Sequence, residues 1–144
     1  MIKMPEQVTM HVTPIQIRFN DIDIIGHVNN AVYQNYFDLA KTHFFDYVFG
    51  NAIDWKISGL ILAHIDIDFF QPVFLNDQII IETTFTKYGQ KSVKMTQIVR
   101  EKNSTSEQGI KAVGHSVMVA FDFLENQSID LPNEWILAIK EHLI

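Results

Sequence analysis

Residues 18–36 read RFNDIDIIGHVNNAVYQNY, and this segment joins a strand-like stretch to a helix-like one. Just before and into it, Ile15, Ile17 and Phe19 alternate with polar residues, which is the two-residue period of a half-buried strand. Residues 20–30 break the period with acids, amides and Gly26, and they predict an ordered loop. The segment therefore predicts a strand over residues 13–19, then a polar loop, then the start of a helix.

The next stretch, residues 31–49, contains neither Pro nor Gly. Its apolar residues recur at three- and four-residue steps, which is typical of a helix with one buried face. Asn29 or Asn30 could cap the free N–H groups at its start, and Gly50 could provide a left-handed stop at its end. We therefore predict one long helix, bounded at both ends.

Four stretches with alternating polarity follow and predict strands over residues 61–70, 78–88, 92–100 and 111–123. Gly89 and Gln90 predict a tight hairpin, and residues 103–109 predict a polar loop, so neighbouring strands should pair antiparallel. On the first of these strands we expect two faces. One face would carry Ile61, Ala63, Ile65, Ile67 and Phe69, and the other His64, Asp66 and Asp68.

These elements predict an α+β fold, in which an antiparallel sheet carries one long helix on one face. A short helix after Pro132 would add Trp135 and Ile139 to the core. The length of 144 residues, the 47% apolar content and the lack of repeats or linkers predict one domain over residues 1–144. Because a lone sheet leaves exposed edges, we expect two subunits to join edge to edge as a homodimer.

Composition and charge disfavour several classes of function. A net charge of −6 argues against nucleic acid or anionic lipid as a partner, and the absence of cysteine excludes disulfides, thiol nucleophiles and thiolate metal sites. Residues 1–12 lack the apolar run of a signal peptide, and no stretch approaches the roughly 20 apolar residues of a membrane span. We therefore expect a cytoplasmic protein.

The candidate chemistry lies in the loop before the long helix. Asp23 precedes the helix start, where unpaired N–H groups carry the positive end of the helix dipole. Hydrolysis of an ester or thioester needs such a carboxylate, as base or nucleophile, and a donor for the oxyanion, for which the Asn30 N–H is our candidate. Gly26 would let a substrate approach closely, and His27 and Asn29 could orient water or the carbonyl.

The same residues also allow a purely structural interpretation. An Asp-x-Asp pair before a helix can serve turn and capping chemistry, and taken alone His27 is more often bonded to a backbone carbonyl. Tyr33 and Tyr36 are expected to be mainly core residues, although we also count Tyr33 with Gly26 among candidate substrate contacts. From the residues alone, the two interpretations are about equally supported.

The pattern Asp-x-Asp-x-x-Gly-His-Val-Asn-Asn over residues 21–30, followed by Tyr33-x-x-Tyr36, resembles the signature of the 4-hydroxybenzoyl-CoA thioesterase family. A weaker resemblance extends over residues 62–70 with Pro72, the hairpin at residues 88–92, and Phe121-Asp122. It implies a hotdog fold, in which a curved antiparallel sheet wraps the long central helix. It also implies homodimers or homotetramers with active sites at subunit interfaces.

The resemblance further implies residue roles. It implies that Asp23 acts as nucleophile or general base, that an amide near Asn30 polarises the thioester carbonyl, and that Asp21 is structural. The Gly-His-Val-Asn-Asn form also resembles acyl-ACP thioesterases, which makes His27 and Asn29 second-rank site residues. We therefore expect an acyl-CoA thioesterase, with an acyl-ACP thioesterase or a non-catalytic acyl-binding protein as the alternatives.

Two further groups of side chains bear on ligands. Lys87, Lys91 and Ser92 near the hairpin could bind the CoA phosphates, or could be ordinary solvated residues. CoA is part of the substrate, so no separate cofactor is expected. His64, Asp66 and Asp68 share a strand face, but without a second cluster they make a weak metal site. His115 stands alone on its strand, and we expect no metal.

Overall fold

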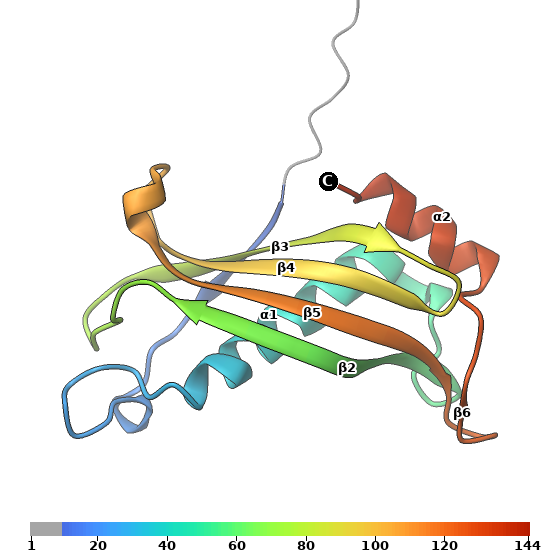
Figure 1. The fold of residues 1–144 in the computed structure, drawn as a ribbon, viewed down its shortest axis with the longest axis horizontal. Coiled ribbons are helices and arrows are strands. Elements are labelled where there is room, and N and C mark those ends of the chain that lie inside the picture. The colour runs from blue at the N-terminus through green and yellow to red at the C-terminus, as the bar shows by residue number, and fades with distance from the viewer. Residues whose placement is uncertain (1–9) are drawn as a thin grey trace, which may run out of the picture.

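The computed structural model describes residues 10–144, so most of the stretch inspected for a signal peptide lies outside the described residues. The strands form one antiparallel sheet in the order β1-β3-β4-β5-β2, with β6 beside β5, and α1 lies along one face (Figure 1). The predicted α+β plan is confirmed. The elements are β1 (His11–Ile15), α1 (Val32–Phe49), β2 (Ser58–Phe69), β3 (Ile79–Tyr88), β4 (Ser92–Glu101), β5 (Ile110–Asp122), β6 (Gln127–Ser128) and α2 (Asn133–Glu141).

The long helix α1 packs closely on the sheet. Phe37 is fully buried, and a side chain added at Gly114 of β5 would come within 3.1 Å of its ring, so the glycine makes room for the helix. The Gln97 Nε2 donates to the Phe37 carbonyl at 3.0 Å and to the Thr83 hydroxyl at 3.3 Å. This buried amide fixes the helix against β3 and β4, because leaving such a group unpaired is costly.

The start of the chain differs from the sequence expectation. The predicted strand over residues 13–19 is instead β1, which ends at Ile15, and Phe19–Asp21 form a single 3₁₀ turn. The Asp21 carboxylate accepts the Arg18 N–H at 2.9 Å, and the Asp21 N–H donates to the Arg18 carbonyl at 2.9 Å. These local bonds close a turn where the alternation of residues predicted a strand.

The expected faces of β2 also need correction. The pairing with β5 shifts register between Leu62 and His64, which makes Ala63 the extra residue of a bulge. Residues that pair directly share a face, so the residues before the bulge lie on the opposite side from the one predicted. Ile61 lies on the outer face with His64 and Asp66. The inner face carries Leu60, Leu62, Ile65, Ile67 and Phe69.

The C-terminal helix α2 confirms the predicted last helix. It buries Trp135 and Ile139 in the core cluster around Phe49 and Phe85, and the Trp135 Nε1 donates to the Ala52 carbonyl at 3.1 Å. Strand β6, which was not predicted, has only two residues and pairs with the end of β5. Within residues 10–144, neither helix combines the length and the apolar character needed to cross a bilayer.

Candidate active site

The loop between β1 and α1 is anchored by the buried carboxylate of Asp21. This residue is 5% exposed, and its Oδ2 accepts the Tyr36 hydroxyl at 2.6 Å as well as the Arg18 N–H. Burial, and then the bond to Asp21, raise the pKa of Tyr36. The Asp21 carbonyl accepts the Asn29 N–H at 2.8 Å. Asp21 therefore ties both ends of the loop to α1, which agrees with the structural role implied for it.

Asp23 lies at the centre of a tight turn in the same loop. Its Oδ1 accepts the N–H groups of Ile25 at 3.1 Å and His27 at 3.4 Å, and its backbone N–H donates to the His27 carbonyl at 2.9 Å. Gly26, in the turn, has a φ of +84°, a conformation that favours glycine. Within residues 10–144, the Asp23 Oδ2 has no hydrogen-bond partner. One carboxylate oxygen thus holds the turn, and the other is available.

Of the two residues expected to cap the start of α1, Asn29 is the one whose side chain accepts an N–H there. Asn29 does contribute, because its Oδ1 accepts the Ala31 N–H at 2.9 Å and its carbonyl accepts the Val32 N–H at 2.9 Å. Among residues 10–144, the Asn30 side chain makes no capping bond. In the described part of the chain its own N–H has no acceptor, so it is a free donor at the positive end of the helix dipole.

A cavity of about 280 Å³ opens beside this helix start. The Tyr33 and Phe69 rings meet edge-on at 5.0 Å in its wall, and the His27 ring packs edge-on against Phe74, also at 5.0 Å. The structure therefore brings three of the predicted site residues together, whereas Asp23 lies in the adjoining turn and does not form part of the wall. The wall consists of His27, Val28, Asn30, Tyr33, Phe69, Phe70, Gln71 and Pro72.

The predicted phosphate contacts lie elsewhere within one chain. Lys87, Lys91 and Ser92 flank the β3–β4 hairpin, which is at the end of the sheet opposite to the loop of Asp23 (Figure 1). The Lys91 Nζ lies 3.2 Å from the Asp130 carboxylate. One chain by itself therefore does not place these side chains beside Asp23.

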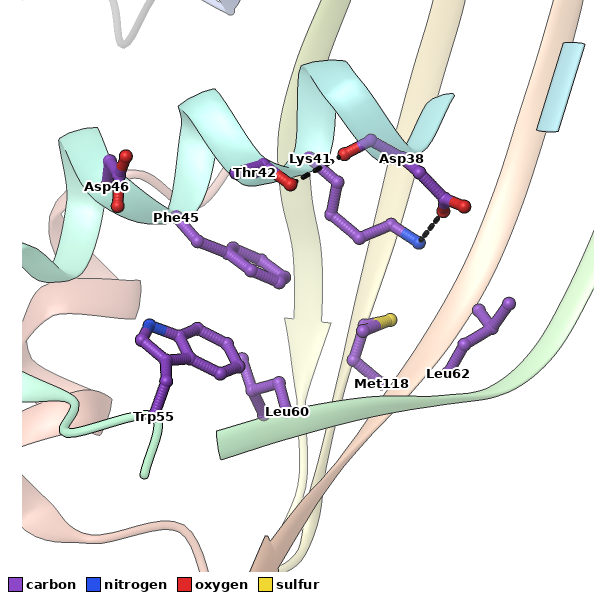
Figure 2. Close-up of a pocket in the computed structure, with 9 residues that line it drawn as sticks. All are labelled: Asp38, Lys41, Thr42, Phe45, Asp46, Trp55, Leu60, Leu62 and Met118. Carbon is purple, nitrogen blue, oxygen red and sulfur yellow. Dashed lines mark hydrogen bonds and ion pairs between the residues drawn. The ribbon is translucent and has the colours of Figure 1, made fainter. Parts of the chain in front are cut away.

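A second cavity, of about 410 Å³, contains a residue to which the sequence analysis gave no function. Figure 2 shows Lys41 reaching from α1 over Met118 and Leu62, with Phe45 against the Trp55 ring. Lys41 is 6% exposed, and its Nζ lies 3.5 Å from the carboxylate of Asp38. Burial lowers the pKa of Lys41, and Asp38 opposes that shift. The sequence did contain a signal for the burial of Lys41, because this lysine lies four residues after Phe37 and therefore on the apolar face of the helix.

Comparisons with known proteins agree with this geometry. A family model described as the thioesterase-like superfamily matches residues 17–139. A thioesterase from Thermus thermophilus, solved in complex with coenzyme A and Zn, is 25% identical, with a TM-score of 0.75 over 90% of this chain and 96% of that one. No curated protein sequence matches.

Two other solved structures show the shared fold at lower identity. A thioesterase-superfamily protein from Jannaschia sp. CCS1 has a TM-score of 0.83 at 17% identity, over 100% of this chain and 99% of that one. A 1,4-dihydroxy-2-naphthoyl-CoA thioesterase from Synechocystis has a TM-score of 0.76 at 21% identity, over 92% and 96%. The family match covers most of the chain, and the chain therefore belongs to the thioesterase-like superfamily, as a thioester hydrolase with the hotdog fold.

Proposed function

We propose that the protein hydrolyses an acyl-CoA thioester, with Asp23 as general base or nucleophile and the Asn30 N–H as oxyanion donor. The observation that carries the proposal is the cavity at the start of α1, which has His27 and Asn30 in its wall and the Asp23 turn beside it. A free N–H at a helix start is suited to a negative charge that develops on a carbonyl oxygen. The coenzyme A bound to the Thermus relative supports CoA as the leaving group.

In the general-base form, the Asp23 Oδ2 takes a proton from water while the water oxygen bonds to the thioester carbonyl carbon. The carbonyl oxygen becomes an oxyanion that accepts the Asn30 N–H. The C–S bond then breaks, the carbonyl re-forms, and the CoA sulfur receives the proton from Asp23. In the nucleophilic form, Asp23 itself bonds to the carbonyl carbon, CoA leaves, and water hydrolyses the resulting anhydride. His27 would orient the carbonyl or the water in either form.

The complete site is proposed to need a second copy of the chain. Strand β2 is twelve residues long and, among residues 10–144, pairs only with β5; Leu62 and Phe69 on its inner face are 40% and 46% exposed. A long edge with exposed apolar side chains is a surface for strand pairing. We propose that two β2 edges pair antiparallel in a homodimer.

The proposed dimer gives a role to the hairpin. Antiparallel pairing of β2 with its copy sets the loop end of one sheet beside the hairpin end of the other. Lys87, Lys91 and Ser92 of one subunit would then lie toward the Asp23 loop of its partner, where the CoA phosphates of a bound substrate need cations and N–H or O–H donors. Two such dimers could also assemble into a tetramer. The molecular mass of the assembly in solution distinguishes a dimer from a tetramer.

The test is thiol release from a panel of acyl-CoAs, short, long and aromatic, with Asp23→Asn against wild type. The amide keeps an oxygen for the turn but cannot accept the proton, so we expect a loss of about a hundredfold or more in kcat. Asp122→Asn is the matched control, because the Asp122 Oδ1 likewise accepts two backbone N–H groups, at 2.9 and 3.0 Å, in an exposed turn.

The other outcomes separate the alternatives. Equal rates for Asp23→Asn and wild type would move the site to His27 and Asn29, with His27 as the base. Turnover of acyl-ACP without turnover of acyl-CoA would show that the acyl group is delivered on acyl carrier protein rather than on CoA. Binding of acyl-CoA without any thiol release would make the chain an acyl-binding module.

A further inference from the structure

Side chains of the types that bind transition metals gather on the outer face of the sheet, the face opposite to α1. Asp66 and Asp68 are two residues apart on β2, so both project from the same face. His115 on β5 pairs directly with Asp66. One ligand atom from each of these three residues can be chosen such that all lie within 4.8 Å of one another.

We propose that Asp66, Asp68 and His115 form a binding site for a divalent transition-metal ion of the Zn²⁺ type. The mixture of carboxylate oxygen and imidazole nitrogen favours such an ion over Ca²⁺ or Mg²⁺, which take oxygen ligands. Two ligands from one strand and a third from its neighbour approach the ion from one side. Three protein ligands leave the remaining coordination positions to water or to a further side chain.

The orientation of His115 supports the site. Thr96 on β4 pairs directly with His115, and its hydroxyl lies 3.2 Å from the His115 Nδ1. With Nδ1 engaged by this hydroxyl, Nε2 is the nitrogen left for a metal. A partner on the second nitrogen of a ligating histidine is a regular feature of metal sites, because it fixes the tautomer and the ring orientation. Thr96 is therefore a positioning residue.

A fourth donor, His64, lines a hollow of about 300 Å³ together with Asp66 and His115, two members of the cluster. The His64 Nε2 is 3.3 Å from the Asp66 Oδ2, and the two residues share this face because they are two positions apart in continuous register. Lys94 also lines the hollow and brings a positive charge that opposes an incoming cation. Asp68 of the cluster adds a second carboxylate to that of Asp66, so the carboxylates of the proposed site outnumber this one ammonium group.

The spacing requires a small adjustment. Two ligands on one Zn²⁺ ion are at most about 4.2 Å apart, since each bond is about 2.0–2.1 Å long. The three ligand atoms lie within 4.8 Å of one another, so any excess over that limit is small. Because all three side chains are exposed, rotamer changes can close that gap without moving the strands.

The proposed ion would have a role separate from hydrolysis, because the cluster faces away from α1 and the Asp23 turn. It would link β2, the edge strand, to β5. An ion that binds only the folded chain raises stability by mass action, so Zn²⁺ should raise the melting temperature. From the sequence we expected no metal, because His115 is alone on its strand; the pairing of His115 with Asp66 across the two strands supplies the further ligands.

The test is calorimetric titration of chelator-treated full-length protein with ZnCl₂, with the Co²⁺ absorption spectrum as a second probe of coordination. We expect one ion per chain. His115→Ala and Asp68→Asn should weaken binding by at least about a hundredfold, and Thr96→Val by about 10- to 100-fold, the range for losing an outer-shell partner. Lys94→Met should tighten binding because it removes a like charge.

His43→Ala is the control, since His43 is an exposed histidine on α1 outside the cluster; it should bind Zn²⁺ as wild type does. Circular dichroism of each variant checks that it is folded. Equal affinity in wild type and His115→Ala would overturn the proposal, as would the absence of saturable Zn²⁺ binding by wild type.

Discussion

Replacing Tyr36 with phenylalanine removes one hydroxyl from the anchor of the active-site loop and leaves the ring in place. That hydroxyl donates to the Asp21 Oδ2 at 2.6 Å, and the two residues are 6% and 5% exposed. A hydrogen bond to a charged group contributes about 1.5–3 kcal/mol. Since Asp21 keeps its bond from the Arg18 N–H, we expect Tyr36→Phe to lower the free energy of unfolding by about 2 kcal/mol.

This loss converts into a measurable shift. At about 2.1 cal/mol/K per residue, a chain of 144 residues has an unfolding entropy of about 0.3 kcal/mol/K, so the melting temperature should fall by about 7 °C. Urea titration and thermal scans of the two proteins give both quantities. Tyr47→Phe is the control, because Tyr47 is 63% exposed and should lose less than about 0.5 kcal/mol.

A double-mutant cycle tests the assignment to Asp21. In an Asp21→Asn background the bond is to a neutral amide, worth about 0.5–1.5 kcal/mol, so Tyr36→Phe should cost about 1 kcal/mol less than in wild type. An equal cost in both backgrounds, or a loss no larger than that of Tyr47→Phe, would refute the reasoning.

Two further predictions concern other parts of the fold. A side chain at Gly59 would overlap the Trp55 ring, so Gly59→Ala should cost about 1–3 kcal/mol by overpacking. Urea titration measures that cost, and unchanged stability and Trp fluorescence would contradict it. Burial, with His43 and His142 nearby, lowers the pKa of His11 below 6.5 in the folded state. The unfolded chain therefore binds the proton more readily, and stability should be complete above about pH 6.5 and decline as pH falls below it. Unfolding at pH 7.5 and 5.5 should show a smaller decline for His11→Gln, and equal declines would count against this role.

The elements that depend on local patterns were predictable. The helix over residues 32–49 follows from an uninterrupted apolar stripe, and the strands after it follow from alternation. The end of β1 at Ile15 was not predictable in this way, because side-chain bonds of Asp21 compete with the strand. The boundary is set by the hydrogen bonds of one residue beyond the strand, which the alternation of apolar and polar residues does not reveal.

In the candidate site, too, some features follow from a local stretch of sequence and others do not. The cavity joins His27, Asn30 and Tyr33, which the sequence places within seven residues of one another. The buried position of Lys41 depends on the packing of α1 against β2, and the pairing of Asp66 with His115 depends on the register of β2 and β5, far apart in sequence. Contacts of this kind are set by the whole sheet, so no single stretch of the sequence reveals them.

The bulge at Ala63 lets one face of β2 stay apolar although the spacing of the apolar residues changes along the strand. After the bulge, every second residue is apolar and faces α1, and the residues between them are His64, Asp66 and Asp68. Without the bulge, strict alternation through Ala63 would put Leu60 and Leu62 on the same face as His64, Asp66 and Asp68, so that either apolar side chains would face water or ionisable ones would face the core. The one extra residue thus keeps the face of β2 beside the helix apolar from Leu60 to Phe69, and it keeps the ionisable side chains together on the opposite face.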